Sequence, residues 1–531
     1  MNPQSSTVEF RAASTLYRRL TPLACIAGGI LYAASLPPYN LGFAVMISLL
    51  ILFFTAENHS GKYRFFCGWL WGWAWAFFSC RFLREIHPAV PFLLAPVLGL
   101  WAAVYTWLLG WFSRGIKREK FPPYLQELLF FLTAAALFTV LEWSRYRLFV
   151  WNDLSVTMWK FPPVMQISQL TGRYGVSFLL VAAAAGIYAL RRRKSGIPAV
   201  MTAALLWAAA LGYGAVKLSS AEKFREPVIF NAALIQGNMP QMRHFTEPEV
   251  MMAVNTYSSM TEKLLKEKSP DAVFWPECAI PIPLRSAAPL AGFYRQSLAP
   301  LLKVPLLIGT LDFAADRTSG MTNSALLIGT DGKVAGKYDK FHRVPFGEYV
   351  PFRKYLPEFM IEAFDMGRDL TDGKELMPLE IIPGVRAGVV ICYEGVFSYV
   401  TAGLARNGAN VLTALSNDVW YPRSSEPEQH LANAVMRAVE TGLPMIRCGN
   451  NGGSGVVSPQ GVFHQYIGSE ADRPELLRES AAGVVTVTLE KYPQKTLFVR
   501  CGSYFPFLLM LMLISGGALI ISRKKFLLTG K

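Results

Sequence analysis

The sequence predicts a polytopic α-helical membrane domain of about eight transmembrane helices, together with one inserted α/β domain. Hydrophobic residues make up 52% of the 531 residues and charged residues only 17%, a composition too apolar for one soluble domain. Long apolar runs cluster near both ends of the chain. Between residues 227 and 490, short β-branched runs instead alternate with helical stretches, which is typical of α/β layered domains.

Eight apolar runs approach or reach the length that a bilayer requires, since a core of about 30 Å takes about 20 helical residues. They lie at residues 20–36, 41–56, 65–83, 89–112, 125–144, 174–190, 198–216 and 503–522. The first two runs are short, and the LPPYN break between them also fits a re-entrant turn. The first run is not predicted to be a signal peptide, because no small-residue cleavage site stands out and further apolar runs follow.

Basic residues flank these runs unevenly, and the richer set of flanks is expected to be cytoplasmic. The richer set holds Arg11, Arg18, Arg19, Lys62, Arg64, Arg114, Lys117, Arg118, Lys120, Arg191, Arg192, Arg193, Lys194, Arg523, Lys524, Lys525 and Lys531. The opposite set holds only Arg81, Arg84, Arg145, Arg147, Lys160 and Arg173. Both termini are therefore predicted inside the cell, and the long segment 217–502 outside.

The net charge of +15 has the same origin, because much of it is lysine and arginine placed beside anionic lipid head groups. A nucleic-acid-binding protein would instead carry a basic, aromatic-rich patch in its soluble part. The soluble part has no such patch, so we expect no nucleic-acid partner.

These patterns divide the chain into seven segments. We predict a cytoplasmic N-terminal segment (1–19), N-terminal transmembrane helices (20–216), a linker (217–226), the inserted domain (227–490), a linker (491–502), a C-terminal transmembrane helix (503–522) and a cytoplasmic tail (523–531).

Within the inserted domain, strands and helices alternate. Strands are predicted at 227–236, 271–277, 304–312, 323–334, 386–394, 409–418 and 443–450, and helices at 248–268 and 426–442. TDG at 330–332 predicts a hairpin turn, and Gly442 ends the second helix. Several polar clusters follow strands, where sites in such folds lie.

Glu277, in FWPECAIP, is the first candidate site residue. A carboxylate beside Trp275 and Pro276 is partly removed from water, which raises its pKa and suits a general base. The alternative is a solvated glutamate in a turn after a strand.

The stretch KYDKFHRVPFGEYVPF (337–352) is the second candidate. It is too irregular for a helix and too polar for a core strand. A lysine in it is able to stabilise an oxyanion. The alternative is a surface loop whose lysines extend their charged ends into water.

Cys392, in GVVICYEGVF, is the third candidate. It lies where a strand gives way to a helix, and backbone N–H groups at such a turn both lower a thiol pKa and form an oxyanion hole. The alternative is a small buried hydrophobic residue, the commonest role of a free cysteine.

Glu277, Lys340 and Cys392, in this order and 63 and 52 residues apart, resemble the catalytic triad of the nitrilase superfamily. With the apolar runs at both ends, the whole chain resembles the apolipoprotein N-acyltransferases of bacterial inner membranes. The motifs that carry the resemblance are QGNMPQ (236–241), WPE (275–277), NSALL (323–327), KYDKFHRVPFGEYVP (337–351), ICYE (391–394), SND with Trp420 (416–420), QH (429–430) and MRAVE (436–440).

The resemblance implies a nitrilase-like αββα sandwich on the periplasmic side and a role for each triad residue. Glu277 is expected to be the general base, Lys340 the oxyanion stabiliser and Cys392 the nucleophile that becomes an S-acyl enzyme. Four further residues match positions that support the site in the family, namely Glu348, Tyr393, Glu394 and Asn323.

The implied reaction is ping-pong acyl transfer. The acyl donor is a membrane phospholipid, and the acceptor is the α-amino group of a diacylglyceryl-modified cysteine at the start of an apolipoprotein. We expect a monomer in the inner membrane, with no cofactor and no metal, and with Cys392 kept as a free thiol.

Four aromatic residues are candidates for contact with lipid: Phe245, Tyr349, Phe359 and Trp420. Tyr349 and Phe359 belong to the aromatic stretch 349–366, expected either to dip into the membrane or to pack under a loop. Phe245 replaces a tryptophan common in the family, and Pro422 replaces a glycine after SNDVWY, which stiffens that loop.

Two other functions remain compatible with the sequence. The first is a membrane-tethered nitrilase-type amidase acting on a small amide, which would not use phospholipid as donor. The second is a transporter with an external binding domain. Ionisable residues inside the membrane usually mark transport paths. Few acidic residues lie in the apolar runs, and Glu142 lies at the end of one, which argues against a transporter.

Overall fold

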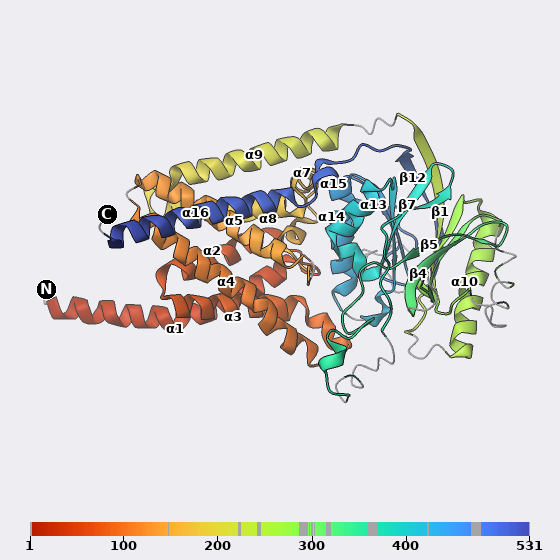
Figure 1. The fold of residues 1–531 in the computed structure, drawn as a ribbon, viewed down its shortest axis with the longest axis horizontal. Coiled ribbons are helices and arrows are strands. Elements are labelled where there is room, and N and C mark those ends of the chain that lie inside the picture. Colours follow the sequence, from red (N-terminus) through yellow and green to blue (C-terminus); the bar gives the residue numbers. More distant parts are fainter. Residues whose placement is uncertain are drawn as a thin grey trace. The chain divides into compact units, whose positions relative to one another are not determined.

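The computed structural model describes residues 3–119, 121–146, 148–220, 225–241, 246–285, 292, 296, 298, 301, 303–314, 320–358, 361, 369–421, 424–468 and 479–529. The chain forms two compact units (Figure 1). The helical unit comprises Met1–Lys217 and Ser503–Lys531, and the α/β unit comprises Leu218–Gly502.

Each apolar run predicted from the sequence contains a helix. These helices are α1 (Pro3–Ser35), α2 (Val45–Asn58), α3 (Gly61–Ser79), α4 (Val90–Arg118), α5 (Pro123–Ser144), α8 (Arg173–Arg192), α9 (Ile197–Ser219) and α16 (Tyr504–Thr529). Short helical elements connect them: η1 (Gly42–Ala44), η2 (Arg81–Glu85), η3 (Leu154–Met158), α6 (Pro162–Met165), α7 (Ser168–Thr171) and η4 (Lys194–Gly196).

Five helices among the described residues are long and apolar enough to cross a membrane. They are Val90–Arg118, Pro123–Ser144, Arg173–Arg192, Lys194–Ser219 and Tyr504–Ser522. The apolar parts of the first two helices, Arg19–Ser35 and Gly42–Glu57, are shorter. The described residues therefore support a polytopic membrane unit with five helices of full spanning length, and the other three of the eight predicted spans stay predictions.

The α/β unit contains two six-stranded sheets. The first has the order β12-β1-β2-β3-β4-β5 and the second β11-β10-β9-β8-β7-β6. The strands of the first are β1 (Pro227–Gln236), β2 (Ala272–Ile280), β3 (Leu306–Phe313), β4 (Met321–Ile328), β5 (Val334–Asp339) and β12 (Ala481–Glu490). Those of the second are β6 (Leu379–Ile382), β7 (Val385–Ile391), β8 (Val411–Ser416), β9 (Met445–Gly449), β10 (Gly455–Val457) and β11 (Phe463–His464).

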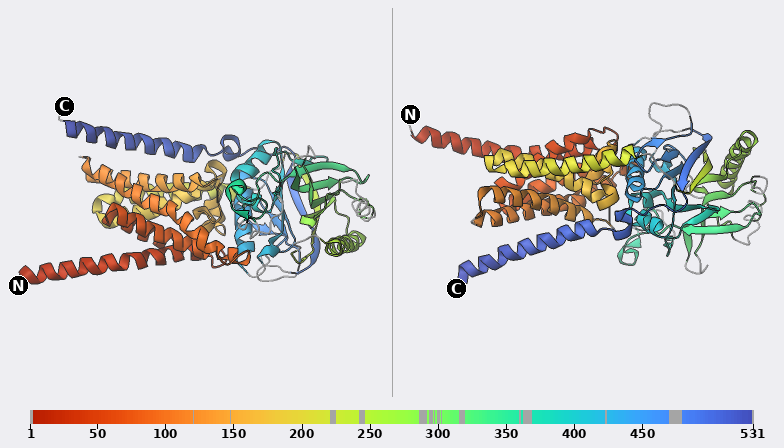
Figure 2. Two further views of the ribbon diagram at one scale, coloured as in Figure 1. Left: turned by 60° about the horizontal axis from the view of Figure 1, so that its bottom comes forward. Right: turned by 90° about the horizontal axis from the view of Figure 1, so that it is seen from above.

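The strands in the middle of each sheet are parallel, and those at the edges antiparallel. β1, β2 and β3 run parallel, as do β7, β8 and β9. Helix α10 (Glu247–Glu267) packs on the first sheet. Helices α13 (Ser398–Arg406) and α14 (Glu426–Thr441) lie beyond the second sheet, so the unit has four layers in the order helix, sheet, sheet, helix (Figures 1 and 2).

The seven strands and two helices predicted for this unit are present. Gly442, with φ of +68°, ends α14 as predicted, because only glycine adopts this left-handed conformation without steric cost. The loop prediction for 337–352 is wrong at its beginning, since Lys337–Asp339 belong to β5 and pair with β4. This edge strand alternates charged and aromatic side chains because one side of it is exposed.

The core between α10 and the first sheet fixes the strand that leads to Glu277. The Trp275 ring is fully buried and stacks on Tyr257 at 5.2 Å between ring centroids. Its Nε1 donates a hydrogen bond to Thr261 Oγ1 at 3.0 Å. Beyond Trp275 the register of β2 against β3 shifts, and irregularities of this kind re-aim side chains beside active sites.

Gly309 on β3 makes room for this irregularity. A Cβ atom there would lie 2.2 Å from the Pro276 carbonyl oxygen and 2.6 Å from Glu277 Cα. No side chain fits at these distances, so glycine lets the two strands approach where the candidate base is placed.

Candidate active site

The structure brings Glu277 and Lys340 together although 63 residues separate them. Glu277 lies on β2, and Lys340 directly follows β5. Lys340 Nζ is 3.4 Å from Glu277 Oε1 and 2.9 Å from Glu348 Oε1. The lysine side chain is 2% exposed, so its charge is compensated by two carboxylates rather than by water.

Asn323, on β4, donates hydrogen bonds to the carboxylates of both Glu277 and Glu348. Its Nδ2 donates to Glu277 Oε1 at 2.8 Å and to Glu348 Oε1 at 2.7 Å. Glu348 Oε2 accepts from the Val344 backbone N–H at 2.8 Å. The geometry thus holds both carboxylates, the lysine and the amide in one buried cluster.

Cys392 begins the short helix η7 (Cys392–Val396) directly after β7 and is half-buried. Its φ is +51°, a left-handed conformation that is uncommon for a residue other than glycine. Conformations of this kind cluster at functional sites, where the surrounding structure holds them in place.

The electrostatics favour a protonated thiol beside a basic carboxylate. Burial raises the pKa of Glu277; the Lys340 charge opposes this rise, and hydrogen bonds from Asn323 and the Cys392 thiol also oppose it. Burial raises the pKa of Cys392 well above its ordinary value, and Glu277 adds to the rise. For Lys340, burial opposes the charged form, but Glu348 and Glu277 outweigh it and raise its pKa. The lysine therefore stays charged, and the thiol has a base to receive its proton.

Glu394 is a buried anchor for the turn that carries Cys392. One carboxylate oxygen accepts from the Ile391 N–H at 2.8 Å. The other accepts from the Tyr338 hydroxyl at 2.9 Å and from the backbone N–H groups of Phe341 at 2.6 Å and His342 at 3.1 Å. Burial raises the pKa of Glu394 to about 7, against the effect of these donors. Glu394 thus ties the Cys392 turn to the chain that follows Lys340.

The remaining predicted residues make other contacts, are exposed, or lie outside the described residues. Tyr393 is half-buried, and its ring packs edge-on against Phe397 at 5.0 Å between centroids. Trp420 is 46% exposed in η8 (Asp418–Trp420), and the Arg343 guanidinium lies 4.3 Å from the centroid of the Tyr349 ring. Phe245 and Phe359 lie outside the described residues.

Part of the aromatic stretch 349–366 is described, and two of its rings are strongly exposed. Phe352 is 77% exposed and Tyr355 is 72% exposed. Rings this exposed are available for contact with a membrane or a partner.

Helix α14 contributes residues to which the sequence had given no role. His430 Nε2 lies 3.0 Å from the Cys392 carbonyl oxygen, and Arg437 donates to the Val396 carbonyl at 2.6 Å. These two carbonyls belong to the first and last residues of η7, so α14 holds both ends of that helix. The QH and MRAVE motifs contain His430 and Arg437, and their spacing of seven residues places both on one helical face.

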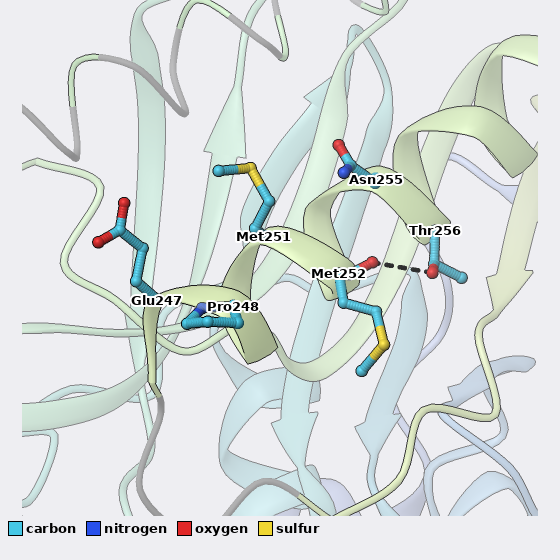
Figure 3. A pocket seen from close by; sticks show the side chains of 6 residues that line it. All are labelled: Glu247, Pro248, Met251, Met252, Asn255 and Thr256. Carbon is cyan, nitrogen blue, oxygen red and sulfur yellow. Dashed lines mark hydrogen bonds between the residues drawn. The ribbon is translucent and has the colours of Figure 1, made fainter.

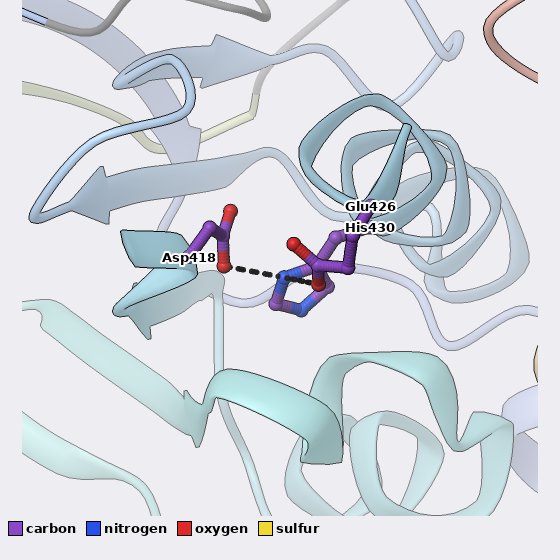
Figure 4. Close-up of side chains that lie close together, drawn as sticks. All are labelled: Asp418, Glu426 and His430. Carbon is purple, nitrogen blue, oxygen red and sulfur yellow. Dashed lines mark hydrogen bonds and ion pairs between the residues drawn. The ribbon is translucent and has the colours of Figure 1, made fainter. Parts of the chain in front are cut away.

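Asp418, Glu426 and His430 bring three side chains of metal-ligand type together, with ligand atoms within 4.8 Å of one another (Figure 4). The surroundings do not suit a cation. Arg447 already donates to Asp418 Oδ2, and His430 Nε2 faces the Cys392 carbonyl. A metal ion would have to lie against the arginine charge, so the geometry fits a hydrogen-bonded ion cluster.

A hollow on the surface of α10 is separate from this site. Glu247, Pro248, Met251, Met252, Asn255 and Thr256 line it (Figure 3). All six come from successive turns of one helix, and none of them belongs to the predicted site.

Two family models match the chain in sequence. The model described as "Apolipoprotein N-acyltransferase N-terminal domain" matches residues 28–186, and the model described as "Carbon-nitrogen hydrolase" matches residues 231–472. The first match lies in the helical unit and the second in the α/β unit.

Curated relatives are similar over most of their length. A protein of Azotobacter vinelandii named apolipoprotein N-acyltransferase is 30% identical over 483 residues, which cover 87% of this chain and 89% of the relative. A protein of the same name from Geobacter metallireducens is 28% identical and covers 83% and 85%. Among solved structures, a carbon-nitrogen hydrolase from Helicobacter pylori covers 49% of this chain and 89% of its own, with 18% identity and a TM-score of 0.35.

Proposed function

Because the chain belongs to the apolipoprotein N-acyltransferase family, we propose that Cys392 carries the acyl group between its two substrates by a ping-pong mechanism. The chain is a membrane acyltransferase that N-acylates lipoproteins, with a phospholipid as acyl donor. The buried pair of Glu277 and Lys340, with the Cys392 thiol hydrogen-bonded to the Glu277 carboxylate, supports the proposed mechanism.

In the first half-reaction, Cys392 Sγ attacks the carbonyl carbon of a phospholipid acyl ester while Glu277 takes the thiol proton. Negative charge develops on the carbonyl oxygen, and the Lys340 ammonium stabilises it. When the intermediate collapses, the carbon–oxygen bond breaks and Glu277 returns the proton to the departing lysophospholipid. An S-acyl cysteine remains.

In the second half-reaction, the α-amino group of a diacylglyceryl-modified cysteine attacks the thioester. Glu277 takes a proton from the amine, the carbon–sulfur bond breaks, and the thiol of Cys392 re-forms. Glu348 and Asn323 hold Glu277 and Lys340 at their distances through both steps, and Glu394 holds the turn of the nucleophile.

The proposed arrangement in the membrane follows from the loop charges. Segment 227–490 is the catalytic domain on the periplasmic side of the inner membrane, and both termini are cytoplasmic. The exposed rings of Phe352 and Tyr355 lie in the stretch proposed to meet the lipid, where Tyr349 and Phe359 are further candidates. Neither substrate leaves the bilayer readily, so a monomer with a site near its surface serves both.

Mass spectrometry of the purified full chain tests the mechanism. Incubated with phospholipid and no acceptor, the protein should gain a fatty-acyl mass on the peptide containing Cys392, and hydroxylamine should remove it. Cys392→Ala should gain none, whereas Cys501→Ser, which removes an exposed thiol outside the site, should behave as the unchanged chain does.

The absence of an adduct on folded protein with a free Cys392 would contradict the proposal and favour the small-amide amidase. If the adduct forms, addition of a diacylglyceryl-cysteine peptide should transfer the acyl group from the enzyme to the peptide amine. Release of free fatty acid instead would show that water is the acceptor.

A further inference from the structure

Both ring nitrogens of His430 face hydrogen-bond acceptors. Nδ1 lies 3.0 Å from Asp418 Oδ1 (Figure 4), and Nε2 lies 3.0 Å from the Cys392 carbonyl oxygen. A backbone carbonyl has no proton to give, and neither has an ionised carboxylate. A neutral imidazole has one N–H and satisfies one of these acceptors, whereas an imidazolium satisfies both.

Asp418 is ionised in this setting. Burial favours its protonated form, but the Arg447 guanidinium and His430 outweigh burial and hold the pKa of Asp418 below its ordinary value. Arg447 is fully buried and donates to the second oxygen of the same carboxylate. Asp418 is therefore an acceptor for both neighbours.

The charges around the imidazole lead to the same conclusion. Two buried carboxylates, Asp418 and Glu426, face it, and Glu426 Oε1 lies 3.6 Å from Nδ1. Arg447 compensates one of them. A protonated imidazole lowers the cost of burying these two negative charges side by side, and a neutral imidazole does not.

Further titratable groups approach this cluster from neighbouring elements. Tyr393 and Cys392 approach from η7, and Tyr421 from the chain after η8. Glu277 and Lys340 act on Cys392 from the first sheet.

We propose that His430 is a positioning residue held as an imidazolium, which fixes the carbonyl of Cys392 and places a positive charge beside the nucleophile. The bond to the carbonyl holds Cys392 at its left-handed φ of +51°. The charge opposes Asp418 and Glu426, both of which disfavour the thiolate. The inference rests on the proposed role of Cys392 as the nucleophile.

Two substitutions separate the hydrogen bond from the charge. His430→Gln keeps an N–H donor near the position of Nε2 but is neutral. His430→Asn keeps a donor near the position of Nδ1, toward Asp418, and no longer reaches the Cys392 carbonyl. Asn433→Ala is the matched control, because Asn433 is a buried polar residue of the same helix that donates to the carbonyl of Gln429.

The first readout is the rate at which iodoacetamide alkylates Cys392 in the purified full chain, followed by peptide mass spectrometry across pH. We expect the pH midpoint of alkylation to rise by about one unit in His430→Gln and to stay unchanged in Asn433→Ala. His430→Asn should show the same rise and form the acyl adduct more slowly than His430→Gln does. Wild-type midpoints in both His430 variants would overturn the proposal.

The second readout is the protonation of the ring itself and needs no substitution that affects folding. The chain has six histidines, and nitrogen NMR of the ¹⁵N-histidine-labelled protein distinguishes rings with one protonated nitrogen from rings with two. One ring, whose signal is absent in His430→Gln, should carry two protons at pH 7. A spectrum in which every ring carries one would overturn the proposal, as would a stoichiometric divalent metal ion in the unchanged protein that His430→Gln loses.

These experiments are independent of the lipid reaction. Alkylation reports the thiol whether or not a phospholipid acylates it. If no acyl adduct forms but alkylation shifts as expected, the proposed mechanism is rejected and the positively charged His430 is retained. If the adduct forms but alkylation does not shift, the mechanism is retained and the charge on His430 is rejected.

Discussion

The side-chain amide of Asn323 is the smallest feature on which the charge balance of the site depends. One nitrogen serves two carboxylates, so Glu277 and Glu348 share a donor as well as the lysine. An aspartate of the same shape would replace that donor with a third negative charge. Asparagine and aspartate differ only in this group, so exchanging them changes the charge beside Glu277 and Glu348 with little change in shape.

We expect Asn323→Asp to raise the pKa of Glu277 further, by about one unit or more, because like charges at contact distance disfavour ionisation. Glu277 must be ionised to take the thiol proton, so the acylation rate should begin to fall at a higher pH as the solution is made acidic. Asn323→Ala, which removes the donor without adding charge, should shift the profile less and in the same direction. An unchanged profile in both variants would contradict the proposed role of Glu277.

Glu277 itself should account for most of the proton transfer. We expect Glu277→Gln to slow formation of the acyl adduct by roughly 10²–10⁴-fold, the usual contribution of a general base. In the unchanged chain the rate should fall as pH drops through the raised pKa of Glu277, above the ordinary carboxyl range, and the variant should lose this limb of the profile. Glu380→Gln, an exposed carboxylate on β6, is the control and should leave rate and profile unchanged.

At the scale of elements, buried hydrogen bonds connect α14 to η7, the short helix that begins with Cys392. Every residue of α14 is buried, including the charged side chains of Arg437 and Glu440. Arg437 Nε donates to Glu440 Oε2 at 2.7 Å while its NH1 group donates to the Val396 carbonyl. Glu440 also accepts from the Ser398 hydroxyl at 3.1 Å, which attaches α13 to the same pair.

Arg437→Met should therefore destabilise the α/β unit strongly. It leaves the Glu440 carboxylate buried without its partner, and such a loss costs about 3–5 kcal/mol. Adding Glu440→Gln should restore part of the stability, because the second change removes the uncompensated charge. Denaturant midpoints followed by tryptophan fluorescence measure both effects, and Glu262→Gln, in an exposed ion pair on α10, should leave the midpoint unchanged.

The elements were largely predictable, whereas the contacts between them were not. β1 was predicted at its observed bounds because its β-branched run is bounded by a proline and a polar cluster. Lys340, Cys392 and Glu277 were located through their resemblance to a known triad. The contact of His430 with Cys392 spans 38 residues, and that of Glu394 with Phe341 spans 53. No local pattern encodes the register between elements so far apart, so their roles required the structure.

On the scale of the whole molecule, the number of membrane crossings decides on which side the α/β unit lies. Of the five full-length spans among the described residues, four precede β1. Four crossings return the chain to the side from which it began. A cytoplasmic N-terminus and a periplasmic α/β unit therefore require that α1, α2 and α3 together add an odd number of crossings.

We expect all three helices to cross, because the basic flanks alternate as that arrangement demands. Lys62 lies in the first turn of α3, at the end predicted to be cytoplasmic, and His87 lies between α3 and α4 on the opposite side. Cysteines placed at His87 and Glu375 should then react with a membrane-impermeant maleimide in spheroplasts, and cysteines at Lys62 and Lys194 only after permeabilisation. All four positions are exposed or lie in exposed loops, so peptide mapping of the label reports topology rather than burial. Labelling of Lys62→Cys in intact spheroplasts, together with labelling of His87→Cys only after permeabilisation, would leave one crossing from α1 and α2 and one from α3, and the crossings before β1 would be even in number. The α/β unit and Cys392 would then face the cytoplasm, which is the wrong side for acylating exported lipoproteins.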